Sequence, residues 1–167
     1  MKPLSQIVEQ QFNIVIDFDG VWIHDGAAIT RKSLVQLFAS ILRRDEAGQY
    51  WLQTPVERGR IAVADVPFIA TSWRIEQLGK EDQRLYLTDN LGREVGVDGS
   101  HPLVLRIPRG KRGPFVPYHQ IGEGIEARMS RSVYYALIDV ALQHGEPSNG
   151  CLQITSFKTR HPLGIAP

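Results

Sequence analysis

Two aspartates, Asp17 and Asp19, lie one residue apart between the apolar run Ile14–Ile16 and Gly20. Paired carboxylates at the end of a strand can serve as a nucleophile, as a general acid or base, or as oxygen ligands for Mg²⁺. The same residues also fit a simpler structural role, because Asp-Gly between two apolar runs is a strong signal for the tight turn of a β-hairpin. The choice between these two roles depends on the other side chains that the sequence supplies.

The segment Ile14–Val21 resembles the first motif of haloacid-dehalogenase-type phosphatases, an apolar strand followed by two aspartates separated by one residue. The resemblance implies that Asp17 attacks phosphorus and Asp19 handles the proton, with Mg²⁺ between them. That family also needs a lysine and a further carboxylate pair downstream. The acidic residues after Asp98 form no such pair; they are Glu123, Glu126, Asp139 and Glu146. We therefore predict a hairpin turn, with a magnesium-dependent phosphatase as the alternative.

The other residues that commonly carry catalysis or hold metals lack the spacing of such sites. The five histidines include no i,i+4 pair, and the single cysteine, Cys151, excludes an intrachain disulfide and a cysteine-rich metal centre. We expect no catalytic residue, no metal site and no cofactor.

The near balance of 19 Lys and Arg against 18 Asp and Glu argues against a nucleic-acid partner. No apolar run reaches the roughly 18 residues of a membrane span, so we expect a cytoplasmic protein without a membrane partner.

Two arginines stand directly after candidate helix caps. Arg31 follows Thr30, which we predict to cap a helix that extends to about residue 43. Arg131 follows Ser130, which we predict to cap a second helix that extends to residue 144. The positive end of the helix dipole opposes an arginine there by about 0.3–1 kcal/mol unless a negative group lies nearby. That group is either a carboxylate or a ligand anion. The candidate carboxylates are Glu57, Asp65 and Glu126.

Between these two helices, the sequence from residue 49 to residue 121 predicts short strands separated by turns. The expected strands are Tyr50–Gln53, Arg60–Val63, Phe68–Gln77, Arg84–Thr88, Glu94–Val97, Pro102–Ile107 and Phe115–Ile121. Because strands and helices do not alternate, the pattern indicates an α+β fold. The segments 29–34 and 129–133 match weakly and suggest two related units. From Glu146 onward, Pro, Gly and Ser predict a loosely attached tail.

Short motifs follow one another through most of residues 12–144. They are Asp19-Gly20-x-Trp22, Gly26-x-x-Ile29-x-Arg31, Leu34-Val35-x-Leu37-Phe38-Ala39, Arg44-Asp45, Thr54-Pro55-Val56-Glu57, Asp65-x-Pro67-Phe68 and Gly124-Ile125-Glu126-Ala127-x-x-x-Arg131. In this order they resemble the bacterial domain-of-unknown-function family 1285. The resemblance implies a duplicated α+β core whose C-terminal half is similar to pleckstrin-homology-type barrels. It also implies a nucleotide-like ligand bound between the halves and a role in signalling.

The residues and the resemblance together predict two related strand-rich units, each with an amphipathic helix. The N-terminal unit is expected over residues 1–64 and the barrel-like unit over 65–146, followed by the tail over 147–167. We expect a non-catalytic binding module for a nucleotide-like or other phosphate-bearing small molecule, with a protein partner in signalling as a further expectation. The expected ligand-binding residues are Arg31, Thr54, Glu57, Asp65, Phe68, Tyr118, Glu126 and Arg131. The alternatives are the phosphatase and a protein-interaction domain without a small ligand.

Overall fold

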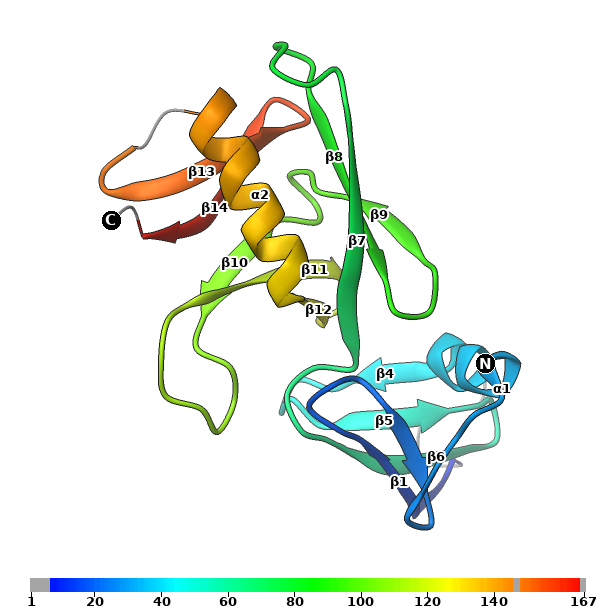
Figure 1. Cartoon of the computed structure of the whole chain (residues 1–167). Helices are drawn as coiled ribbons and strands as arrows, with labels where there is room; N and C mark the ends of the chain where they lie inside the picture. Colours follow the sequence, from blue (N-terminus) through cyan, green and yellow to red (C-terminus); the bar gives the residue numbers. More distant parts are fainter. Residues whose placement is uncertain (1–6, 146–147, 166–167) are drawn as a thin grey trace. The chain divides into compact units, whose positions relative to one another are not determined.

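The computed structural model describes residues 7–145 and 148–165 and divides the chain into two units (Figure 1). Unit 1 comprises Met1–Pro67, and unit 2 comprises Phe68–Pro167. The first unit therefore ends slightly later than the expected residue 64. The expectation of two strand-rich units with few helices is confirmed, and each unit is described by itself.

The described part of unit 1 contains a six-stranded sheet and one helix. Its elements are β1 Val8–Ile16, β2 Trp22–His24, β3 Ala27–Ala28, α1 Lys32–Ser40, β4 Leu42–Arg44, β5 Tyr50–Gln53 and β6 Glu57–Val63. The strands lie in the order β3-β2-β1-β6-β5-β4, and only β1 and β6 run parallel to each other. Ile14, Ile16 and Ile61 are buried on one face of the sheet. Alternation of apolar and polar residues along the strands therefore places the core on that face.

Two hairpin turns in unit 1 form where Asp-Gly pairs predict them. Between β1 and β2, Asp17 Oδ1 accepts hydrogen bonds from the backbone N–H groups of Asp19 and Val21, each at 2.9 Å. Between β2 and β3, Asp25 and Gly26 have φ values of 48° and 80°. A two-residue type I′ turn requires this left-handed pair. The Asp17 carboxylate thus stabilises the turn between its two strands.

Helix α1 begins later and ends earlier than the sequence suggests. Its N-cap is Arg31 rather than Thr30, and no side chain caps the first turn. The expected end at about residue 43 is wrong, because the chain enters β4 at Leu42. Leu42 is buried and pairs with Leu52 of β5. Pairing across the sheet therefore overrides the helical spacing of the apolar residues.

Unit 2 contains a second six-stranded sheet, a longer helix and a two-stranded hairpin. Its elements are β7 Phe68–Glu76, β8 Arg84–Asp89, β9 Glu94–Gly96, β10 Leu103–Arg106, β11 Val116–Gly122, β12 Ile125–Met129, α2 Arg131–His144, β13 Cys151–Ser156 and β14 Thr159–Ile165. The sheet has the order β10-β11-β12-β7-β8-β9. Helix α2 has the expected N-cap, since the Ser130 hydroxyl accepts a hydrogen bond from the N–H of Val133 at 3.3 Å.

The two sheets share one topology. When the strands are numbered from the first strand of each sheet, both sheets have the order 3-2-1-6-5-4. Among the described strands of each sheet, the first and the sixth form the only parallel pair, β1 with β6 and β7 with β12. This shared order fits a duplication. The helices do not correspond, because α1 follows the third strand of its sheet and α2 follows the sixth. The match between segments 29–34 and 129–133 is therefore wrong as an alignment of the repeat.

Within the segment expected to be a loose tail, residues 148–165 form an ordered part of unit 2, and the other residues of that segment lie outside the described part of the chain. In the β13–β14 hairpin, Leu152, Ile154 and Leu163 are buried. His161 of β14 accepts at Nδ1 a hydrogen bond from the backbone N–H of Leu103 in β10, at 3.4 Å. The expectation is wrong because alternating apolar residues give this segment one face to bury against β10 and α2. No helix in the described part of the chain is long and apolar enough to cross a membrane.

Candidate ligand-binding site

The four expected site residues of unit 1 lie in different surroundings. Thr54 closes the turn between β5 and β6, because its hydroxyl accepts from the Glu57 N–H and donates to the Glu57 carbonyl, both at 3.2 Å. The Glu57 carboxylate accepts a hydrogen bond from Gln10 Nε2 at 2.6 Å. Asp65 is buried, whereas Arg31 is exposed before the first residue of α1.

In unit 2, the expected residues Tyr118 and Glu126 meet at a third residue, Arg106. The Arg106 guanidinium forms an ion pair with Glu126 Oε2 and lies 3.9 Å from the centre of the Tyr118 ring. Phe68 has the same kind of contact with Arg93, also at 3.9 Å. An arginine over an aromatic face is attracted by the ring quadrupole. The three expected residues are buried, and arginines of their own unit cover them.

Arg31 and Arg131 do not pair with the carboxylates proposed for them. Arg131 is the first residue of α2 and is exposed. Within residues 7–145 and 148–165, neither guanidinium forms an ion pair or a hydrogen bond. Glu126 pairs instead with Arg106 of the same unit. The assignment of all eight expected residues to one ligand site stays a prediction.

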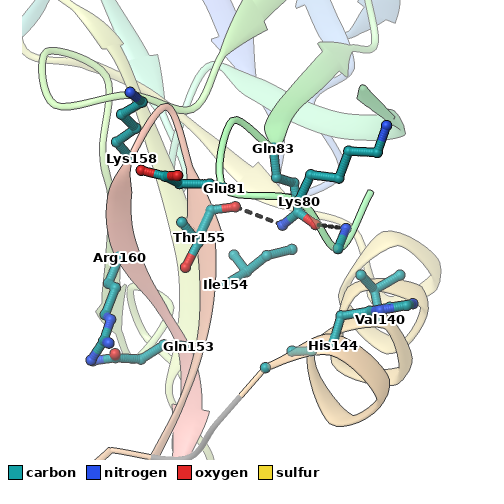
Figure 2. A pocket seen from close by; sticks show the side chains of 13 residues that line it. Lys80, Glu81, Gln83, Val140, His144, Gln153, Ile154, Thr155, Lys158 and Arg160 are labelled. Carbon is teal, nitrogen blue, oxygen red and sulfur yellow. Dashed lines mark hydrogen bonds between the residues drawn. The ribbon is translucent and has the colours of Figure 1, made fainter. Parts of the chain in front are cut away.

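A cavity of about 440 Å³ lies in unit 2, at a place that the motifs do not indicate (Figure 2). Three segments line it: the loop between β7 and β8, the last turn of α2, and the β13–β14 hairpin. The lining residues are Gly79, Lys80, Glu81, Gln83, Val140, Ala141, His144, Gly145, Gln153, Ile154, Thr155, Lys158 and Arg160. Small-molecule sites commonly have volumes of roughly 300–1,000 Å³, so this cavity is large enough for a ligand.

The buried side chain of Gln83 joins two walls of this cavity. Its Oε1 accepts a hydrogen bond from the N–H of Gly79 at 2.8 Å, and its Nε2 donates to the Thr155 carbonyl at 2.7 Å (Figure 2). Gly79 has a φ of 74°, and a Cβ there would lie 3.1 Å from His144 Nδ1. Both the left-handed backbone and the close helix end favour glycine at this position. Gln83 and Gly79 thus hold the loop against the hairpin and α2.

Positive charge predominates around the cavity. Among the described lining residues, Lys80, Lys158 and Arg160 stand against a single carboxylate, Glu81. None of the three cations forms an ion pair with a described residue. Gln153 Oε1 is buried and has no hydrogen-bond partner within the described segments. The cavity therefore offers cations for an anionic group and one buried acceptor for an N–H or O–H of the same ligand.

Sequence motifs miss this cavity because its charged residues come from distant segments. Lys80 lies in the loop before β8, whereas Lys158 and Arg160 lie in the segment expected to be a tail. One signal could have revealed the hairpin. Leu152 and Ile154 alternate with less buried residues along β13, and alternation of period two is typical of a half-buried strand.

The described fold defines a protein of two strand-rich units with one sheet topology, the second of which carries a cavity lined by cations. This chain belongs to the DUF1285 family. Residues 6–66 match the family model "Domain of unknown function (DUF1285), N-terminal domain". Residues 67–163 match "Protein of unknown function (DUF1285), C-terminal domain". The family resemblance drawn from the motifs is therefore confirmed.

Two solved structures of the same family are similar to this chain. A DUF1285 family protein from Silicibacter pomeroyi DSS-3 is 29% identical with a TM-score of 0.84, over 98% of this chain and 87% of that one. A DUF1285 family protein from Shewanella baltica OS155 is 22% identical with a TM-score of 0.58, over 77% of this chain and 91% of that one. The second likeness shows the fold alone. A comparison with curated proteins gives no match.

Proposed function

We propose that this chain is a non-catalytic binding module for a small phosphate-bearing, nucleotide-like molecule, held in the cavity of unit 2. The observation that supports the proposal is the excess of cations among the described residues that line this cavity, Lys80, Lys158 and Arg160 against Glu81. Clustered positive charge raises the local concentration of an anion and its rate of association. The volume of about 440 Å³ leaves room for more than the phosphate group.

The lining residues offer a ligand positive charge, a hydrogen-bond acceptor and apolar surface. Arg160 can donate two parallel N–H hydrogen bonds to a phosphate, and Lys158 adds a second positive charge from the same hairpin. Lys80 adds a third cation from the loop between β7 and β8, and its side chain extends away from the hairpin (Figure 2). Gln153 Oε1 can accept a hydrogen bond from a ligand N–H or O–H, and Ile154 supplies apolar surface for a ring.

A role in signalling belongs to the same proposal, as does the likeness of unit 2 to pleckstrin-homology-type barrels. Both rest on the family resemblance. A module without catalytic groups can transmit the presence of its ligand because binding stabilises one conformation, which a protein partner can then recognise. The hydrogen bonds of Asp17 to two backbone N–H groups favour this module over the phosphatase alternative, since they give that carboxylate a structural role.

Calorimetric titration of the full chain with AMP, cyclic AMP and inorganic phosphate at low salt tests the proposal. We expect a nucleotide to bind and its affinity to fall as salt rises, because salt screens the exposed cations. At about 100 times its Kd the ligand should raise the free energy of unfolding by about 2.7 kcal/mol. Arg160→Gln and Lys158→Gln should each weaken binding by about tenfold or more, since a hydrogen bond to a charged group contributes about 1.5–3 kcal/mol.

Arg112→Gln is the matched control, because it removes the same charge from the exposed loop between β10 and β11. This variant should bind as the wild type does, and all three variants should melt within a few degrees of it. An equal loss of affinity in Arg112→Gln would assign the effect to overall charge. The absence of binding by all three probes would contradict the proposal.

A further inference from the structure

A second cavity, of about 430 Å³, lies within unit 1. It forms where β1 leaves its regular pairing with β6, since the register shifts between Gln11 and Val15. Phe12, Asn13 and Ile14 of the irregular segment line the cavity, together with the end of α1 and part of β5. Such irregularities in a strand often lie beside binding sites, because they redirect side chains out of the regular sheet.

The floor of this second cavity is apolar and is held in place by the fold. Leu52 is only 2% exposed. The Phe38 ring stacks on Trp22, with ring centres 6.2 Å apart and planes 22° apart. The Phe12 ring lies directly against Gly59, where any Cβ would overlap it. Apolar surface that is already fixed in position costs a ligand little ordering of the protein.

The polar side chains at this cavity include two carboxylates, and among the lining residues that the structure describes there is no lysine or arginine. Asp25 Oδ1 accepts a hydrogen bond from Asn13 Nδ2 at 2.7 Å, and Asp25 Oδ2 lies 3.3 Å from His24 Nε2. Glu57 Oε2 accepts from Gln10 Nε2 at 2.6 Å. Within the described segments, Glu57 Oε1 has no hydrogen-bond partner. The carboxylate of Glu57 is thus oriented through one oxygen, and the other can accept a further hydrogen bond.

We propose that the cavity of unit 1 binds a small organic amine, with its aromatic or branched aliphatic body against Phe12, Phe38 and Leu52 and its ammonium group at Glu57. Burial of the apolar body supplies affinity. The carboxylates select the charge, because an anion of the same shape would be repelled and an ammonium group is attracted. This ligand is opposite in charge to the one proposed for unit 2, so the two proposals stand independently.

Three probes that share one ring system and differ in charge test this proposal: 2-naphthylmethylamine, 2-naphthylmethanol and 2-naphthoate. Each is titrated into the full chain, and binding is followed by saturation-transfer NMR and calorimetry. We expect the amine to bind about fivefold more tightly than the alcohol, the range of a partly exposed ion pair, and the carboxylate to bind more weakly than both. Glu57→Gln should lower the affinity for the amine to that for the alcohol, and it should leave the affinity for the alcohol unchanged.

Glu46→Gln is the matched control, because it removes one carboxylate from the exposed turn between β4 and β5 of the same unit. Its affinity for the amine should equal that of the wild type. Ile41→Trp, which enlarges a side chain of the cavity wall, should abolish binding of both the amine and the alcohol while far-UV circular dichroism stays unchanged. Inorganic phosphate should not compete with the amine. Equal affinity for all three probes, or an amine affinity that Glu57→Gln does not change, would overturn the proposal.

Discussion

Acidification should destabilise unit 2 through His119, a buried histidine of β11. Only 1% of this residue is exposed, and its Nε2 lies 3.3 Å from the carbonyl oxygen of Gly96. Burial lowers the pKa of His119 from 6.5 to about 4, and the neighbouring His101 and His161 act in the same direction through their charge. Burial also lowers the pKa of His161. In the folded chain, His119 is therefore a neutral ring at neutral pH.

The sign of the pH effect follows from the state that binds more protons. Between pH 6.5 and pH 4 the unfolded chain protonates this histidine and the folded chain does not. The contribution of the neutral His119 to the free energy of unfolding is therefore complete above about pH 6.5, and it is lost as the pH falls towards 4. The pKa of His119 differs by about 2.5 between the unfolded and the folded chain, which corresponds to a full contribution of about 3 kcal/mol to the free energy of unfolding. About 2 kcal/mol of this should be lost between pH 7 and pH 4.5.

Urea unfolding at pH 7 and at pH 4.5 measures this loss in the wild type and in His119→Gln. The glutamine can donate to the Gly96 carbonyl but does not titrate, so its loss of stability on acidification should be smaller by about 2 kcal/mol. Carboxylates titrate in the same range, and only the difference between the two proteins reports on His119. His24→Gln changes an exposed histidine of unit 1 and serves as the control. Its loss of stability between pH 7 and pH 4.5 should equal that of the wild type. An equal loss in His119→Gln would refute the reasoning.

Three further predictions concern single contacts. The wild type should show no magnesium-dependent hydrolysis of p-nitrophenyl phosphate, and hydrolysis that Asp17→Asn abolishes would restore the phosphatase. Arg106→Ala should cost about 2 kcal/mol in urea unfolding, because it leaves Glu126 buried without its ion pair. Arg131→Ala, at an exposed position, should change stability by less than about 0.5 kcal/mol. If Arg106→Ala and Arg131→Ala cost the same free energy of unfolding, the pairing of Glu126 with Arg106 is contradicted. Gly59→Ala should cost about 1–3 kcal/mol, since the methyl group overlaps an aromatic ring; an unchanged unfolding midpoint would contradict this contact.

Sequence reasoning succeeds for elements whose determinants lie within a few residues. The turn at Asp25-Gly26 needs two left-handed residues in succession, and Ser130 needs only the N–H of Val133 to cap α2. Strand β4 fails this condition. Leu42 fits the apolar face of a helix as well as a strand, and the choice depends on its pairing with Leu52. That pairing depends on the rest of the sheet, which no local pattern contains.

The candidate sites depend even more on distant segments. From sequence spacing, Glu126 is a candidate partner of Arg131, yet it pairs with Arg106 from another strand of the sheet. The two cavities are likewise formed by segments that lie far apart in the sequence. Both sheets have one topology, but the cavity of unit 1 lies between α1 and the irregular part of β1, whereas that of unit 2 lies among α2, the β13–β14 hairpin and a long loop. The segments by which the two units differ therefore determine which side chains line each cavity, and under the two proposals one sheet topology carries two unlike ligands.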